Sequence, residues 1–264
     1  MGGPPGNEDP WVPYYYFNDG WMISDLWLAL FDNVDFRMLF ADRVYKQCFN
    51  GGALVDDNAQ ARWNTLTDFI SDAVICEKAR WGGDDTPTIV DMNGRVDIFI
   101  NELRDWNHPS YPGINLYPDI DPPIFSQHGG HVATGFSLEL TNPNGSGVIY
   151  YTLDGSDPRE PVTADPVGTA YGGIITLNES THVKARVYDD DEWSALNEVT
   201  FAVGPVGENL RITEIMYHPE DENDPNTEFV ELKNIGAEPI NLNMVGFTNG
   251  IDFTFPSLAL GPNE

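Results

Sequence analysis

Basic residues are scarce in this 264-residue chain, which has 13 Lys and Arg against 42 Asp and Glu and a formal net charge of −29. Proteins that bind nucleic acid neutralise its phosphates with Lys and Arg, so we expect no nucleic-acid partner. The same deficit disfavours binding to anionic membrane surfaces. A strongly acidic chain stays soluble by self-repulsion, which suits a secreted or cell-surface protein, and it leaves carboxylates free for Ca²⁺.

Long apolar runs are missing as well. No stretch approaches the roughly 18 residues of a membrane-spanning helix, so no transmembrane segment is expected. The opening MGGPPGNEDPW lacks the basic and apolar regions of a secretory signal, so we expect either that a signal precedes Met1 or that there is none. Hydrophobic residues still make up 41% of the chain, enough for packed cores in two or three domains.

Cysteine is nearly absent. The chain has two, Cys48 and Cys76, and both lie in segments with a helical pattern. Their spacing does not decide whether they are bonded, and we favour two buried free thiols.

Common catalytic motifs are also lacking, since GxxxxGK[ST], HExxH and GxSxG do not occur. His128 and His131 have the spacing of metal ligands, but a zinc site needs three or four converging ligands, and we favour a glycine turn. Glu214 and Glu231 lie among Thr and Lys neighbours, which favours a structural role over acid–base chemistry. We therefore expect no catalytic residue in this chain.

Helical periodicity marks the first part of the chain. One helix is predicted between Asn33, a good N-cap, and the stop signal Asn50-Gly51-Gly52. Two more helices are predicted over about 57–81 and 91–106. Their apolar faces are, in order, Phe36, Leu39, Phe40, Val44 and Cys48; Trp63, Leu66, Ile70 and Ala73; and Val96, Phe99, Ile100 and Leu103.

The pattern then changes to that of strands. Residues 111–123 are rich in Pro, Gly and Asp, which predicts a linker. Beyond it the apolar residues recur with period two, and turn signals separate the runs. In the clearest case Val183, Ala185 and Val187 alternate with Lys184, Arg186 and Tyr188. Strands at this spacing indicate a β-sandwich over residues 120–204.

The most distinctive segment is VIYYTLDGSDPR, Val148–Arg159, in which an alternating run breaks into a turn of Asp, Gly, Ser and Pro. It resembles the signature of the chitobiase/β-hexosaminidase C-terminal module, a small immunoglobulin-like sandwich. In glycosidases this module is an accessory to a separate catalytic barrel, so the resemblance implies a binding or structural role. We expect the carboxylates of Asp154 and Asp157 to accept backbone N–H bonds within the turn.

A short linker, Gly204–Gly207, precedes a further β region. The strands LRITEIMYHP (Leu210–Pro219) and EFVELKNIG (Glu228–Gly236), followed by INL and VGF, resemble the lamin-tail domain, another immunoglobulin-like sandwich. The resemblance covers about the first half of such a domain. We therefore expect a truncated module over residues 208–264.

The helical part resembles a third family. The segment DFRMLFADRVYKQCFNGGAL, Asp35–Leu54, and the helix ending EKARWG are similar to the C-terminal helices of CotH-type kinase-like bacterial proteins. The resemblance implies that residues 1–115 are the end of such a domain, whose metal-binding residues would lie before Met1. The expected fold class is thus multidomain α + β, with a helical subdomain followed by two immunoglobulin-like sandwiches.

Two groups of side chains are candidates for ligand binding. Acidic residues at a predicted hairpin tip and in an acidic loop without the EF-hand pattern are candidate calcium ligands, namely Asp189, Asp190, Asp191, Asp221 and Asp224. The alternative for the hairpin tip is a solvated turn without a metal. Aromatic residues of the predicted sandwich can stack on sugar rings, namely Tyr151, Tyr171, Tyr188 and Trp193. The alternative is that they pack in the core, which must hold one of each adjacent pair because neighbouring side chains of a strand point to opposite faces.

The expected function is that of a non-catalytic accessory, binding or spacer portion of a secreted or cell-surface bacterial protein. Its partner would be an extracellular glycan or protein, and Ca²⁺ is its one candidate cofactor. Two alternatives stay open. The chain completes the fold of a CotH-type secreted protein kinase, or it is a structural stalk stiffened by calcium.

Overall fold

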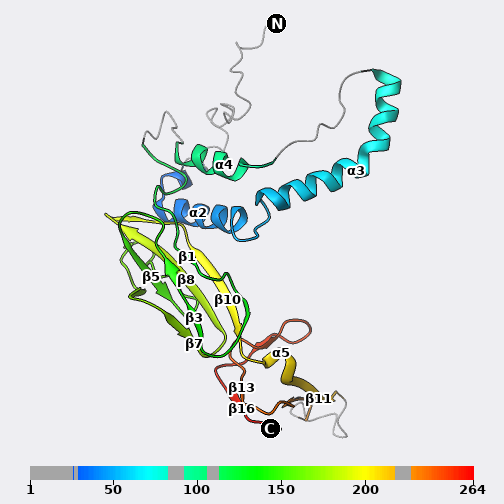
Figure 1. Ribbon diagram of the computed structural model, residues 1–264, viewed down its shortest axis with the longest axis vertical. Coiled ribbons are helices and arrows are strands. Elements are labelled where there is room, and N and C mark those ends of the chain that lie inside the picture. The colour runs from blue at the N-terminus through cyan, green and yellow to red at the C-terminus, as the bar shows by residue number, and fades with distance from the viewer. Residues whose placement is uncertain (1–25, 27–28, 83–91, 106–112, 218–226) are drawn as a thin grey trace.

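The computed structural model describes residues 26, 29–82, 92–105, 113–217 and 227–264. Helices form one end of the molecule, a β-rich unit lies in the middle, and a smaller β unit with the C-terminus forms the other end (Figure 1). The fold is therefore mixed α + β, with several small sheets, as expected at this coarse level. None of the helices in these ranges is long and apolar enough to span a membrane.

Helix α2, Val34–Cys48, forms where the sequence predicts it. Asn33 caps it by accepting the N–H of Phe36 at 3.0 Å, and the chain turns away at Gly51, whose φ is +80°. The buried face differs from the predicted one, because Leu39 is 53% exposed. The residues of α2 that are buried are Ala41, Val44, Tyr45 and Cys48.

Helix α3, Asp56–Trp81, also ends at the predicted glycine, Gly82, but it buries none of its residues. Its predicted apolar side is therefore wrong as a core face; Leu66, for example, is 63% exposed. The same exposure corrects the expectation of two buried thiols. Both cysteines are free, but only Cys48 is buried, and Cys76 on α3 is exposed.

Helix α4, Arg95–Arg104, is shorter than predicted and packs beside α2. Asp56 begins α3 and also caps α4, since its carboxylate accepts the N–H groups of Gly94 and Val96 at 2.6 and 3.2 Å. Ile100 is buried in the core of this helical unit. That core consists of Phe31, Ala41, Val44, Tyr45, Cys48, Ile100, Leu103, Leu116, Tyr117 and Ala195.

The predicted linker is packed rather than free over the part that the structure describes, residues 113–123. Leu116 and Tyr117 are 2% and 1% exposed and belong to the helical core. The N–H of Leu116 donates to the carbonyl of Leu103 at 3.0 Å. Pro, Gly and Asp correctly predict the irregular backbone here, but composition does not tell whether an irregular segment is buried.

The first β unit follows, and it is built on a six-stranded sheet. Its main path runs in the order β2 (Gly130–Val132), β10 (Asn197–Val203), β8 (Thr181–Asp189), β5 (Val148–Thr152) and β6 (Thr169–Ala170), and β9 (Glu192–Trp193) pairs with β8. Only the β2–β10 pair is parallel. Two antiparallel pairs accompany this sheet, namely β1 (Ile124–Phe125) with β4 (Leu140–Thr141) and β3 (Phe136–Leu138) with β7 (Ile175–Leu177).

One hydrophobic core joins these three sheets. Val183, Ala185 and Val187 of β8 are fully buried in it, which confirms the face predicted from their alternation. Every strand of the unit except β6 and β9 supplies at least one residue of this core, which consists of Phe125, Val132, Leu138, Leu140, Ile149, Ile175, Leu177, Val183, Ala185, Val187, Val199, Phe201 and Val203.

The second β unit has a much smaller core. After the short helix α5 (Val206–Asn209) come three antiparallel pairs, β11 (Leu210–Met216) with β12 (Phe229–Asn234), β13 (Ile240–Asn241) with β16 (Ala259–Leu260), and β14 (Gly246–Phe247) with β15 (Phe253–Thr254). Among its described residues, Asn234, Ile240 and Leu242 are buried. Asn234 links separate segments, since its side-chain amide donates to the carbonyls of Glu238 and Leu260 at 2.8 and 3.1 Å.

We predict that Leu116→Ala lowers the free energy of unfolding by about 3 kcal/mol, because it removes a fully buried side chain. Leu54→Ala is the matched control in the same half of the chain, since Leu54 is 47% exposed, and it should cost no more than about 1 kcal/mol. Both values follow from urea titration monitored by circular dichroism. Equal effects of the two variants would mean that residues 113–123 are a free linker.

Candidate functional site

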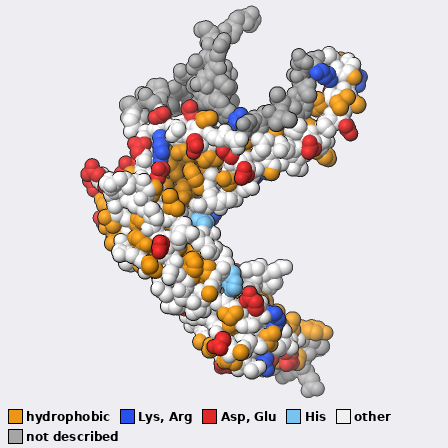
Figure 2. Space-filling view, in the orientation of Figure 1, with side chains coloured by type: hydrophobic (Ala, Val, Ile, Leu, Met, Phe, Trp, Pro, Cys, Tyr) orange, Lys and Arg blue, Asp and Glu red, His pale blue; other side chains and the backbone are white. Residues whose placement is uncertain are grey.

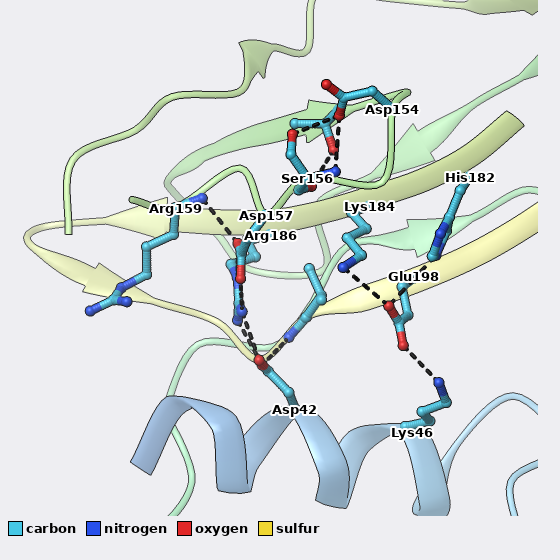
Figure 3. Close-up of polar contacts among 12 residues, drawn as sticks. Asp42, Lys46, Asp154, Ser156, Asp157, Arg159, His182, Lys184, Arg186 and Glu198 are labelled. Atoms are coloured by element: carbon cyan, nitrogen blue, oxygen red, sulfur yellow. Dashed lines mark hydrogen bonds and ion pairs between the residues drawn. The ribbon is translucent and has the colours of Figure 1, made fainter. Parts of the chain in front are cut away.

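A single buried arginine joins the helical unit to the first β unit. Arg186 lies on β8, and its side chain is 2% exposed. Its Nε and Nη2 donate to Asp157 at 2.8 and 2.6 Å, and its Nη1 and Nη2 donate to Asp42 at 2.7 Å each. Nη1 also donates to the carbonyl of Ser194 at 3.0 Å. All five N–H donors of the guanidinium are therefore used, and both carboxylates are bound in a two-pronged geometry (Figure 3).

Asp157 is presented by the turn that the sequence marks most clearly. As predicted, both carboxylates of the turn accept backbone N–H bonds: Asp154 from Ser156 at 2.9 Å and Asp157 from Arg159 at 3.0 Å. Gly155 has a φ of +79°, which favours glycine at this position. The turn thereby fixes the Asp157 carboxylate in place for Arg186.

Asp42 is presented by α2. Besides Arg186, its carboxylate accepts the N–H of Leu196 at 2.8 Å, in the segment that connects β9 and β10. Two further ion pairs lie on the same side of the helix. Arg159 reaches Asp35 at 2.8 Å, and Lys46 reaches Glu198 at 2.7 Å. Helical residues 7 and 4 positions apart share one face, so α2 contacts the sheet through a row of charged side chains.

Glu198 gathers three basic groups at the end of this row. Lys46 lies at 2.7 Å, Lys184 at 3.5 Å and His182 at 3.6 Å (Figure 3). Burial acts to raise the pKa of Glu198, but the hydrogen bond and charge of Lys46 and the other bases lower it overall. Burial is the largest influence on His182 and lowers its pKa. Glu198 is therefore held as a carboxylate beside a neutral imidazole.

The electrostatics of Arg186 and Asp157 favour the ion pair strongly. Burial acts to lower the pKa of Arg186, but the hydrogen bonds and charges of Asp157 and Asp42 outweigh it and raise the pKa. Burial acts to raise the pKa of Asp157, and the hydrogen bonds and charge of Arg186 lower it overall. Both groups are therefore ionised in the folded state.

The sequence gives no direct sign of this junction. The alternation of β8 places Arg186 on the face opposite Val183 and Val187, where a solvent-exposed side chain is the usual outcome. That face is instead covered by α2 and by the Ser194–Leu196 segment. The one local clue is the turn, because its Asp157 precedes Pro158 and Arg159 in the VIYYTLDGSDPR segment.

The predicted stacking aromatics fall into two separate groups. Tyr151 and Tyr171 meet edge to face, with ring centroids 6.3 Å apart, and both pack against the core of the first β unit. The ring centroids of Tyr188 and Trp193 are 4.7 Å apart, and the ring of Tyr150 contacts both. Trp193 is 3% exposed, and its Nε1 donates to the carbonyl of Ala164 at 2.8 Å. The four residues therefore do not form one exposed platform.

The predicted calcium ligands of the hairpin tip are partly engaged with protein groups. Asp190 and Asp191 have positive φ, which makes the tight turn between β8 and β9. Asp189 accepts a hydrogen bond from Ser146, and Asp191 accepts one from Tyr188 at 2.8 Å, which raises the pKa of the phenol. The described residues hold no group of three or more His, Cys, Asp or Glu that could bind a metal ion. Asp221 and Asp224 lie outside the described residues.

The remaining candidates do not converge on one site. His128 Nε2 contacts Asn197 at 2.9 Å and His131 Nε2 contacts the carbonyl of Gly204 at 2.7 Å, so the two rings have different partners. Glu214 and Glu231 face each other across β11 and β12.

Comparison with known proteins identifies one region. Residues 138–200 match a family described as Fn3 associated. The match contains both Asp157 and Arg186, and it lies within the sandwich predicted over residues 120–204. It does not reach the segments that resemble CotH-type and lamin-tail proteins. No curated protein and no solved structure matches the chain.

We predict that Arg186→Met costs about 3 kcal/mol of stability, because it leaves Asp42 and Asp157 close together without their shared cation. Lys46→Met is the matched control at the same junction. Its ion pair with Glu198 is half exposed, so the expected loss is below about 1 kcal/mol. Chemical unfolding of both variants provides the measurement. Similar losses of unfolding free energy in the two variants would contradict the prediction that the buried ion cluster stabilises the protein more than the half-exposed pair.

The lowered pKa of Asp157 also predicts acid sensitivity. Because this pKa is lower in the folded than in the unfolded protein, the unfolded state binds more protons as the pH falls. Stability from Asp157 is complete above its unfolded pKa of about 4 and is lost as the pH falls through the folded value. Asp157→Asn should therefore be less stable than the wild type at pH 7, and the difference should shrink between about pH 5 and 2. A constant difference across this range would contradict the assignment.

Proposed function

We propose that residues 120–204 form an immunoglobulin-like accessory sandwich without catalytic residues, which holds the helical unit rigidly in a secreted or cell-surface protein. The match to the Fn3-associated family supports the accessory nature of this region. The observation that carries the proposal is the buried Arg186, which binds one carboxylate of its own unit and one of α2.

The geometry of the junction opposes both sliding and rotation of α2. Asp35, Asp42 and Lys46 span most of the helix and contact three separate places on the β unit, namely Arg159, Arg186 and Glu198. One contact would let the helix pivot. Three contacts along its length fix both its direction and its register.

Apolar packing reinforces these polar contacts. Ala195, from the connection between β9 and β10, is fully buried within the core of the helical unit. Interfaces between domains of one chain are often polar and permit relative motion. A shared core together with a buried ion pair favours a fixed arrangement instead.

A second junction supports a spacer role. Glu179 and Ser180, between β7 and β8, bind the second β unit. Glu179 accepts hydrogen bonds from Asn241 at 2.9 Å and Ser257 at 2.5 Å, and the Ser180 carbonyl accepts one from Asn243 at 2.7 Å. The first β unit is thus attached to a neighbour at each end. The alternatives of completing a CotH-type kinase and of a calcium-stiffened stalk remain predictions from the sequence.

Hydrogen exchange tests the rigid attachment. In the wild type we expect the slowest amides of α2 and of β8 to exchange with the same free energy, because the two elements open together. In Asp42→Ala the amides of α2 should exchange at least about tenfold faster than those of β8, since the helix then opens alone.

Asp72→Ala is the control for a lost carboxylate, because Asp72 lies on the exposed helix α3. It should leave the exchange of α2 and β8 equal. If the α2 amides of the wild type already exchange faster than those of β8, the two units are not coupled and the proposal fails.

A further inference from the structure

The second β unit contains an apolar groove. Its walls come from the β11–β12 pair and from the segment around β14 and β15, and its volume is about 290 Å³. That is roughly ten times the ~30 Å³ that a water molecule occupies in the liquid, so the groove can hold several apolar groups. The lining residues include Leu210, Arg211, Ile212, Leu232, Phe247 and Phe255.

A bulge in β11 enlarges the apolar surface beside this groove. The register shifts between Ile212 and Glu214, so that Ile212 pairs with Leu232 and Ile215 pairs with Val230. Residues 230 and 232 share one face of β12, so both isoleucines lie on that face. They are nevertheless 53% and 58% exposed. Hydrophobic side chains gather at this end of the molecule in Figure 2.

Strand β11 lines the groove over three consecutive residues. Leu210, Arg211 and Ile212 all line it, although neighbouring side chains of a strand point to opposite faces. Within the described residues β11 pairs with β12 alone. A two-stranded ribbon is marginally stable by itself, and an open strand edge is a template for another strand.

Charge indicates what kind of strand fits. Residues 208–264 contain eleven acidic and two basic residues. One of the two bases, Arg211, donates to the carbonyls of Gly207 and Leu210 at 3.1 and 2.7 Å and is therefore engaged by its own backbone. A net charge of −29 also makes a second copy of this chain repel the first.

We propose that this groove binds an extended polypeptide segment with alternating apolar and basic side chains, which adds to β11 as a third strand. Apolar side chains on one face of the segment fill the groove. Its backbone pairs with the open edge of β11, and its basic side chains are attracted by the net negative charge of residues 208–264.

Fluorescence anisotropy with the full chain tests this proposal. The probe is a fluorescein-labelled peptide of five Val-Lys repeats in 150 mM salt. The control peptide has five Val followed by five Lys, with the same composition and charge but without one apolar face. We expect the alternating peptide to bind at least about tenfold more tightly.

Ile212→Asn should weaken binding of the alternating peptide about tenfold, because it removes an apolar wall. Ile251→Asn is the matched control, since Ile251 is 51% exposed in the same unit and does not line the groove. Equal binding of the two peptides would reduce the interaction to non-specific charge attraction and overturn the proposal. A wild type that sediments as a dimer, and as a monomer after Ile212→Asn, would overturn it in favour of a second copy.

A further measurement avoids the risk that Ile212→Asn unfolds the unit. Hydrogen exchange of the wild type with saturating alternating peptide should slow the amides of Leu210–Met216, while those of β8 stay unchanged. Unchanged exchange throughout β11 in the presence of bound peptide would also overturn the proposal.

Discussion

A guanidinium with all five N–H donors engaged cannot shift without losing several charge-assisted bonds together, and Arg186 is such a group. It connects the Asp157 turn, helix α2 and the segment after β9 at one point. The placement of the helical unit on the first β unit therefore depends on this one side chain more than on any other polar contact.

Joining two elements through such a cluster of buried charges costs desolvation free energy. Two carboxylates and one cation are taken out of water, and apolar side chains of the same volume often give equal or greater stability. Apolar contacts, however, tolerate small shifts of a helix along a sheet. The forked geometry of Arg186 accepts carboxylates in a single orientation, so the ion cluster contributes register and direction where packing alone would leave both loosely defined.

Local features of the fold are readable from the sequence, and long-range ones are not. Asn33, Gly82 and the alternation of β8 act on their own neighbours, and each marks an element that the structure confirms. Arg186 shows the limit. Its alternation correctly assigns it to the face opposite Val183, but what covers that face depends on Asp42, 144 positions away. The buried state of Leu116 and Trp193 has the same non-local origin.

Because basic residues are scarce in this chain, their positions are informative. With 13 bases against 42 acids, most carboxylates of this chain have no cation available. Yet Lys46, Arg159, Lys184 and Arg186 all lie where α2 meets the first β unit, and Arg104 pairs with Asp121 at 2.6 Å close by. Repulsion among the unpaired carboxylates disfavours the compact state, whereas the cations at the junction bind acidic groups of different elements. Salt screens exposed ion pairs more strongly than buried ones. The buried ion pair between Arg186 and Asp42 on α2 therefore persists at ionic strengths that weaken the exposed pairs.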